Sequence, residues 1–384
     1  MSIVAQESFS VVNYGAVGDG ETDDAQAFDK AWSDTCDGTS GVPSMIIPEG
    51  KTYLVGPLTF KGPCKVNNVN IEIYGSIIAP NTPSAWEGID SSQWLMFDGI
   101  SGLSISGPGL IDGRGSSWWD QSCKHHPELP ALRFSKCNGL NLRNMKVINS
   151  PQTHILILGC SEVVIDTIKI SSPRDSPNTD GIHIHSSQHV DIYKSEIENG
   201  DDCISIGDFV SHIKINNAYC GFGHGISIGS LGNGPDGPTE AQVEDISVVD
   251  ARFMNTTNGA RIKTWQGASG YARDISFEQL NFANVENPII IDQNYCKVKG
   301  ACKEQPTGVQ ISNVIYRGIT GTTITKVAVN LNCSEAVPCT EILLDNIKLD
   351  PAISGQQLDS SCNHAYGLTN GVVQPPSCLE SKSL

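Results

Sequence analysis

The feature that most constrains the fold is a short, β-branched-rich run of residues that recurs along most of the chain. Nine such runs begin at similar points of a repeating unit, at Leu103, Leu140, Val163, Val190, Ile213, Ile246, Ile275, Val309 and Ile342. The spacing is most even in the middle of the series, from Leu140 to Ile213, and longer turns are inserted elsewhere. Self-similarity at a period of about 20 to 50 residues is typical of a solenoid.

Each repeating unit holds two or three short strands and almost no helix, which excludes leucine-rich and helical repeats. The sequence therefore predicts an all-β chain folded as a right-handed parallel β-helix. We expect one domain over residues 1–384, with an N-terminal cap at about 9–64, coils at about 65–350 and a disulfide-stapled tail at about 351–384. A pair of β-sandwiches would show frequent hairpin turns of the Asn-Gly type at regular intervals, and the chain lacks that rhythm. One helix is predicted from Asp23 to Trp32, capped by Thr22.

Thirteen cysteines and no pair with zinc-binding spacing predict a disulfide framework, which forms in an oxidising compartment. We expect the pairs Cys333–Cys339 and Cys362–Cys378 in the tail, and Cys203–Cys220 further up the chain. The odd total leaves at least one thiol over. Two glycosylation sequons, at Asn255 and Asn332, are compatible with a secreted glycoprotein.

The net charge of −17 argues against nucleic acid or an anionic membrane as a partner. No apolar run reaches the roughly 18 residues that a membrane span requires. Met1 to Ser10 lacks the basic and apolar regions of a signal peptide. We therefore expect a secreted protein in its mature form, with an added start methionine.

Four short motifs lie in consecutive repeating units: Asn178-Thr-Asp180, Gly200-Asp201-Asp202, Gly223-His224-Gly225 and Arg261-Ile-Lys263. The sequence separation of Asp180 and Asp202 equals that of Asp202 and His224. In a β-helix with coils of that length, residues one period apart stack at about 4.8 Å. Stacked carboxyls cannot all ionise, so the pKa of one is expected to rise. A protonated acid beside an ionised base is the pairing that glycoside hydrolysis requires.

Arg261 and Lys263 share one face of a predicted strand because side chains at i and i+2 point the same way. A guanidinium binds a carboxylate through two parallel hydrogen bonds. The pair therefore indicates a sugar substrate that carries a carboxylate.

The four motifs in this order resemble those of the polygalacturonases, glycoside hydrolase family 28, plant type. The resemblance spans about residues 9–380, and its most specific segments are Asn13–Asp24, Cys220–Gly232, Thr257–Gly267 and Asn287–Cys296. It implies a β-helix of the pectin-lyase-like kind. It also implies an inverting hydrolase that cleaves α-1,4-galacturonosyl bonds of homogalacturonan (polygalacturonic acid), with no metal or cofactor.

By this resemblance, Asp201 is the general acid, Asp180 and Asp202 activate water, and His224 tunes the protonation of the acid. Arg261 and Lys263 hold the substrate carboxylate, Tyr295 lines the next sugar subsite and Asn178 shapes the site. The resemblance further implies a monomer in the plant cell wall or apoplast, with a polygalacturonase-inhibiting protein as a partner. Short loops at residues 100–125 favour endo action.

Other functions stay open at this point. An exo-polygalacturonase or a rhamnogalacturonan hydrolase would use similar chemistry, and a pectate or pectin lyase would use a similar solenoid. A catalytically silent solenoid that binds the cell wall or an inhibitor is a fourth alternative. Paired carboxylates such as Asp201 and Asp202 also suit calcium.

Overall fold

The computed structural model of the protein describes residues 7–90, 92–119, 129–234, 237–296 and 305–381. The chain divides into two compact units, whose bounds are residues 1–183 and 190–201 for unit 1 and residues 184–189 and 202–384 for unit 2. Strands β17 (Ile182–His185) and β18 (Gln188–Tyr193) contain residues of both units. Met1 to Gln6 and residues 120–125 of the expected short loops lie outside the described residues.

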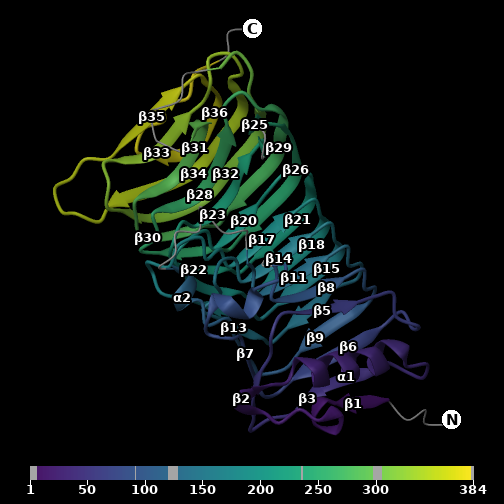
Figure 1. Cartoon of the computed structure of the whole chain (residues 1–384). Helices are drawn as coiled ribbons and strands as arrows, with labels where there is room; N and C mark the ends of the chain where they lie inside the picture. The colour runs from purple at the N-terminus through teal and green to yellow at the C-terminus, as the bar shows by residue number, and fades with distance from the viewer. Residues whose placement is uncertain (1–6, 91, 120–128, 235–236, 297–304, 382–384) are drawn as a thin grey trace, which may run out of the picture. The chain divides into compact units, whose positions relative to one another are not determined.

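Unit 1 consists of parallel strands that repeat coil after coil (Figure 1). One series is β1 (Ser8–Ser10), β3 (Ser44–Ile47), β6 (Val69–Ile73), β9 (Leu103–Ser106), β12 (Asn141–Arg143) and β15 (Ser161–Asp166). A second is β2 (Asp19–Asp23), β4 (Thr52–Leu54), β7 (Ser76–Ile78), β10 (Leu110–Asp112), β13 (Lys146–Ile148), β16 (Lys169–Ser171) and β19 (Glu196–Asn199). The third is β5 (Leu58–Lys61), β8 (Leu95–Asp98), β11 (Leu132–Ser135) and β14 (Ile155–Leu158).

Unit 2 continues the same pattern with its own three series. The first is β21 (Val210–Asn216), β26 (Glu240–Val249), β29 (Ser269–Glu278), β32 (Gln310–Thr323), β34 (Cys339–Pro351) and β36 (Ala365–Gln374). The second is β22 (Tyr219–Phe222), β27 (Arg252–Met254) and β30 (Asn281–Val285), which pairs with β32. The third is β20 (Ile204–Ile206), β23 (Ile226–Leu231), β28 (Asn258–Trp265), β31 (Asn287–Tyr295), β33 (Val327–Asn332) and β35 (Asp359–Asn363). A two-stranded antiparallel ribbon, β24 (Asn233–Gly234) and β25 (Gly237–Pro238), is attached to it.

The predicted parallel β-helix is confirmed. The recurring runs pair with one another in register, for example Ile213 with Ile246 and Ile246 with Ile275. Parallel pairing begins before residue 65, because β3 already pairs with β6, and it continues into the tail, where β35 pairs with β33.

The helix prediction was right in kind and wrong in its bounds. Helix α1 runs from Ala25 to Asp37, so it begins two residues later and ends five residues later than expected. Thr22 does not cap it: its hydroxyl donates to Asp19 within β2. Asp24 occupies the cap position, and its carboxylate instead accepts hydrogen bonds from the backbone N–H groups of Val17 and Gly18. Three short helical turns complete the described elements, η1 (Val11–Tyr14), η2 (Pro83–Trp86) and α2 (Ser116–Trp119).

Single residues in the left-handed conformation make the sharp corners between strands of successive series. Asn144 (φ 53°) lies between β12 and β13, and Asn217 (φ 56°) lies between β21 and β22. Asparagine adopts this conformation more readily than most residues because its short polar side chain can bond locally. These corners let each coil close in few residues, which keeps the period short.

The inward side chains form stacks that run from coil to coil. In unit 1, Phe60, Phe97 and Phe134 are aligned by the strand register, with ring centroids 4.7 and 4.9 Å apart. In unit 2, Phe277 stacks on Tyr316 at 5.4 Å. Offset stacking of aromatic rings stabilises beyond the burial of their area, so these columns fix the register of the turns at either end.

The three expected disulfides, Cys203–Cys220, Cys333–Cys339 and Cys362–Cys378, are all present. A further bond joins Cys36 at the end of α1 to Cys64. Among the described residues, the thiols of Cys137 and Cys160 take part in no disulfide and lie against each other in the core.

None of the helices in the described part of the chain is long and apolar enough to cross a membrane.

Candidate active site

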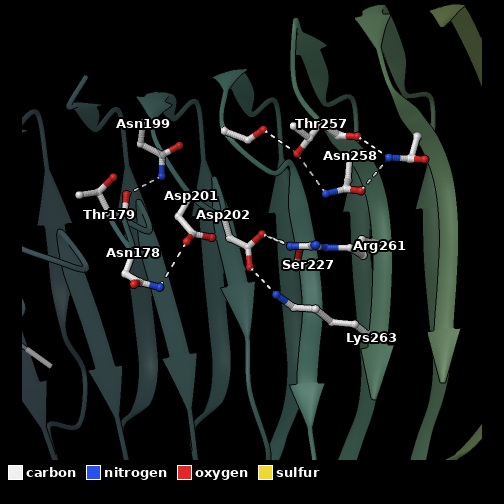
Figure 2. A network of polar contacts seen from close by, with 12 residues as sticks. Asn178, Thr179, Asn199, Asp201, Asp202, Ser227, Thr257, Asn258, Arg261 and Lys263 are labelled. Atoms are coloured by element: carbon white, nitrogen blue, oxygen red, sulfur yellow. Dashed lines mark hydrogen bonds and ion pairs between the residues drawn. The ribbon is translucent and has the colours of Figure 1, made fainter. Parts of the chain in front are cut away.

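The carboxylate of Asp202 is the centre of a buried polar cluster in unit 2 (Figure 2). Its Oδ1 accepts hydrogen bonds from the Ser227 hydroxyl at 2.7 Å and from Nη2 of Arg261 at 2.5 Å. Its Oδ2 accepts a bond from Nζ of Lys263 at 3.1 Å. The Asp202 side chain is only 3% exposed, and those of Arg261 and Lys263 are 12% and 11% exposed. Two predicted site cations therefore both contact a predicted site carboxylate.

Strand register explains why these side chains meet. Ile204 pairs with Ile226, so Asp202 and His224 precede β20 and β23 by the same two residues. Ser227 on β23 pairs with Arg261 on β28, and Nε of Arg261 donates to the Ser227 hydroxyl at 2.7 Å. The spacing of Asp202 and His224 in the sequence is thus the length of the coil that joins this pair of strands.

Burial alone would raise the pKa of Asp202, because desolvation disfavours a charged carboxylate. The charges of Arg261 and Lys263 outweigh burial, and His224 and the Ser227 hydroxyl act in the same direction, so the pKa is held well below its usual range. Asp202 therefore stays ionised at every physiological pH. The expectation that stacking raises the pKa of one carboxyl does not apply to Asp202.

Two glycines of the predicted motifs are required by close backbone contacts. A Cβ on Gly225 would lie 2.1 Å from the carbonyl oxygen of Asn258, and Gly225 has a φ of +75°. A Cβ on Gly200 would lie 2.0 Å from the carbonyl oxygen of Ser176. Any other residue at either position would displace the backbone next to a predicted site residue, His224 or Asp201.

In unit 1, the backbone that carries Asp180 and Asp201 is braced from both sides. Asn199 donates to the carbonyl of Thr179 at 2.7 Å, and the N–H of Gly200 donates to the Thr179 hydroxyl at 3.1 Å. Because Asp180 follows Thr179 and Asp201 follows Gly200, these bonds fix the two turns against each other (Figure 2).

Asn178, which was predicted, and His154, which was not, lie against the two aspartates of unit 1. Nδ2 of the exposed Asn178 donates to the Asp201 carboxylate at 3.4 Å. The backbone N–H and Nδ1 of His154 both lie within 3.0 Å of the Asp180 carbonyl oxygen. His154 is fully buried, and burial lowers the pKa of its ring to about 4, so the imidazole is neutral.

Tyr295 lies beside Lys263, whose Nζ is 5.5 Å from the centre of the tyrosine ring. Its ring also meets that of Trp265 edge-on at 6.0 Å, because the two residues pair across β28 and β31. The predicted subsite tyrosine is therefore next to one of the predicted substrate cations.

Calcium at Asp201 and Asp202, the alternative that the sequence left open, fits the surroundings of Asp202 poorly. Calcium binds about six to eight oxygen ligands, whereas both oxygens of Asp202 already contact cations of the protein. A calcium ion bound there would lie beside the charges of Arg261 and Lys263, which oppose its binding.

The sequence reasoning missed Ser227, Asn199 and His154. The only sequence signal for Ser227 was that it lies between two inward-facing residues of β23. A residue at that position faces outward from the strand, and here it pairs with Arg261. The braces made by Asn199 and His154 have no sequence signal, because they depend on how the coils align. Three tryptophans differ in their surroundings: Trp118 is 8% exposed and packs edge-on against Trp86, Trp265 packs against Tyr295, and Trp119 is half-buried beside a cavity.

The sequence profile described as "Glycosyl hydrolases family 28" matches residues 36–370. The chain belongs to glycosyl hydrolase family 28. The prediction of a glycoside hydrolase of this family is confirmed.

Relatives in plants are similar over nearly the whole chain. A probable polygalacturonase of Arabidopsis thaliana is 43% identical over 96% of this chain and 83% of its own length. A polygalacturonase of Malus domestica is 42% identical, covering 96% of this chain and 79% of its own. Polygalacturonase-2 of Solanum lycopersicum is 40% identical, covering 96% and 80%.

Solved structures show the same fold at lower identity. The endo-xylogalacturonan hydrolase of Aspergillus tubingensis has a TM-score of 0.82 at 23% identity, covering 95% of this chain and 98% of its own. The polygalacturonase of Erwinia carotovora has a TM-score of 0.73 at 21% identity, covering 100% and 99%. At this identity the likeness supports the right-handed β-helix and not the substrate.

Proposed function

We propose that this enzyme hydrolyses α-1,4-galacturonosyl bonds in pectic homogalacturonan, acting within the chain and inverting the anomeric configuration. The single observation that carries the proposal is the buried Asp202 carboxylate, which Arg261 and Lys263 keep ionised. An ionised carboxylate in a largely buried site is a base that can take a proton from water. The plant relatives, which are named polygalacturonases, support the choice of substrate.

In the proposed reaction, Asp201 donates a proton to the glycosidic oxygen while that oxygen leaves the anomeric carbon. Asp202, with Asp180, takes a proton from the water that attacks the same carbon from the opposite face. The proton count balances, because Asp201 loses one proton and the base pair gains one. His224 favours the protonated form of Asp201 before each turnover.

Arg261 and Lys263 serve two roles in this proposal. They lower the pKa of Asp202, and they also attract the carboxylate of the sugar at the point of cleavage. A protein with a net charge of −17 repels a polyanion as a whole, so local cations have to hold the substrate. Tyr295 and Asn178 would then border the sugars on either side of the broken bond.

A neutral rhamnose at the point of cleavage would offer the two cations no substrate carboxylate, which favours homogalacturonan over rhamnogalacturonan. Endo action rests on the expected short loops at residues 100–125, of which residues 100–119 are described. The disulfides and the plant relatives support a secreted enzyme of the cell wall or apoplast. We also propose that the enzyme is a monomer and that a polygalacturonase-inhibiting protein binds it.

Product analysis on de-esterified polygalacturonate at about pH 5 tests the proposal, with viscosity and oligomer size followed together. Rapid loss of viscosity with mixed saturated oligomers is expected. Release of monomer at nearly constant viscosity would show exo action in place of the proposed endo action. Products with an unsaturated sugar, which absorbs ultraviolet light where the saturated sugar does not, would identify a lyase and overturn the proposed chemistry.

Absence of any product would contradict the function as a whole. Rhamnogalacturonan and xylogalacturonan would then be the next substrates to test. Activity that survives excess chelator would agree with a reaction that needs no calcium, and loss of activity on chelation would contradict it.

A further inference from the structure

The cavity beside Trp119 lies in unit 1 and is polar. Its volume is about 390 Å³, and it is lined by Asn81, Asp112, Arg114, Ser116, Trp119 and Asn149. Binding pockets for small molecules fall in the range of about 300 to 1,000 Å³ and combine aromatic surface with a few placed polar groups. This cavity has both the size and the composition of such a site.

Arg114 gives the cavity a cation that forms no ion pair with any residue that the structure describes. The residue is half-buried, and among the described residues its guanidinium has neither an ion pair nor a side-chain hydrogen bond. The carboxylate of Asp112 binds the backbone N–H of Arg114 at 3.0 Å and Nδ2 of Asn149 at 3.3 Å instead. The five N–H donors of a guanidinium suit a carboxylate ligand.

The wall of the cavity is held rigidly. Arg114 and Asn149 both adopt the left-handed conformation, with φ of 47° and 48°. The N–H of Gly115 donates to the Asn149 carbonyl at 2.8 Å, and Nε1 of Trp119 donates to the Ser150 carbonyl at 3.1 Å. The Trp119 ring is therefore fixed beside the cation, so binding loses little side-chain entropy.

The position of the cavity relates it to Asp201 through strand register within unit 1. Asp112 pairs with Ile148, Ile148 with Ser171, and Ser171 with Glu198. Arg114 follows Asp112 by two residues and Asp201 follows Glu198 by three, so both lie just beyond the same edge of the sheet. Three strand spacings of about 4.8 Å separate the two positions, which is about 14 Å.

We propose that this cavity is a distal subsite, in which Arg114 binds the carboxylate of a galacturonate unit and Trp119 packs against its sugar ring. This inference rests on the proposed function, since it assigns part of the same polyuronate chain to a second place. A substrate that runs along the coils reaches the cavity only when it is several sugars long. The cavity therefore determines a preference for long, de-esterified substrates.

The test compares Arg114→Gln with the unchanged enzyme on a ladder of saturated galacturonate oligomers, from the trimer to the octamer. In the unchanged enzyme, kcat/KM is expected to rise steeply once an oligomer reaches the cavity. In Arg114→Gln, the advantage of the longest over the shortest oligomer is expected to shrink about tenfold, because a hydrogen bond between charged groups is lost. Trp119→Ala should shrink the same ratio. An unchanged ratio in both variants would overturn the proposal.

Arg143→Gln is the matched control. It makes the same change of charge on β12, where the exposed Arg143 donates to the Asn141 side chain outside the cavity. This control variant should keep the length dependence of the unchanged enzyme. If Arg143→Gln and Arg114→Gln lost the length dependence equally, the effect would come from the overall charge of the protein, which would contradict a subsite.

A binding measurement separates this proposal from the proposed function. Calorimetric titration of the Asp201→Asn variant with the longest oligomer, with and without Arg114→Gln, requires no turnover. Weaker binding by about tenfold in the double variant supports the subsite even if no hydrolysis is ever found. Hydrolysis with equal binding by both variants would support the function and overturn the subsite.

Discussion

Two polar regions of this protein use the same residue types in opposite ways. Around Asp202, the protein supplies the partners itself: Arg261 and Lys263 are paired with a buried carboxylate. Around Arg114, the neighbouring Asp112 carboxylate is bound to a backbone N–H and an amide, and the guanidinium forms no ion pair with the described residues. Under the two proposals, Arg261 and Lys263 set the charge state of Asp202 as well as attracting the substrate carboxylate, whereas Arg114 serves substrate binding alone.

Replacing Asp202 by Asn should show the largest difference between the two regions. The variant leaves two buried cations without their partner, and removing one member of a buried ion pair costs about 3–5 kcal/mol in the free energy of unfolding. Urea unfolding at pH 7 measures the loss. Arg114 forms no ion pair with the residues that the structure describes, so Arg114→Gln should change the free energy of unfolding by less than about 0.5 kcal/mol. Equal losses in the two variants would show that the regions do not differ.

Lys263→Met should move the acid limb of the pH profile of kcat/KM to higher pH. The amino group helps to hold the pKa of Asp202 below its usual value of about 4. Without this amino group burial has less opposition, so the pKa rises and the base is protonated at a higher pH, by about one unit or more. Rate measurements from about pH 2 to pH 7 test this shift. An acid limb that stays in place or moves to lower pH would contradict the role of Lys263.

The same pKa shift predicts how stability depends on pH. The pKa of Asp202 is lower in the folded than in the unfolded state, so the ionised side chain adds to the free energy of unfolding at pH values above the unfolded pKa of about 4. That contribution is lost as the pH falls through the folded pKa. The stability difference between the unchanged enzyme and Asp202→Asn should therefore be smaller at about pH 2 than at pH 7. A difference that grows on acidification would contradict an ionised Asp202.

The neighbouring tryptophans Trp118 and Trp119 sharpen the comparison on the side of Arg114. Trp118 is buried against Trp86, so Trp118→Ala should lower the free energy of unfolding by about 3 kcal/mol or more. Trp119→Ala should cost less stability and instead reduce the preference for long substrates. Thermal unfolding together with oligomer kinetics distinguishes the two. A greater loss of stability in Trp119→Ala would show that its ring belongs to the core.

Much of the fold could be predicted because the period of a β-helix is visible in the sequence as recurring runs of similar residues. The runs at Ile213, Ile246 and Ile275 pair in register. The spacing between Asp202 and His224 likewise equals the offset of the strands that follow them, in which Ile204 pairs with Ile226. The bounds of α1 could not be predicted, because Asp24 binds the distant turn at Val17 and Gly18. Local sequence gives no sign of that contact.

The candidate site was predictable as a set of residues and not as a set of contacts. The order of the motifs identified Asp202, Arg261 and Lys263, but it did not reveal that both cations bind the aspartate. The distal cavity had no sequence signal at all. Arg114 lies between β10 and α2, and the absence of an ion pair to it among the described residues depends on how the Asp112 carboxylate makes its hydrogen bonds.

The most direct test of the central claim is the rate at which Asp201→Asn hydrolyses polygalacturonate, measured beside the unchanged enzyme. Asn cannot donate the proton, so we expect a loss of about 10²- to 10⁴-fold in kcat, with the circular dichroism and urea midpoint of the unchanged enzyme. A variant that is folded and retains the full rate would contradict the assignment of Asp201 as the acid and, with it, the proposed mechanism.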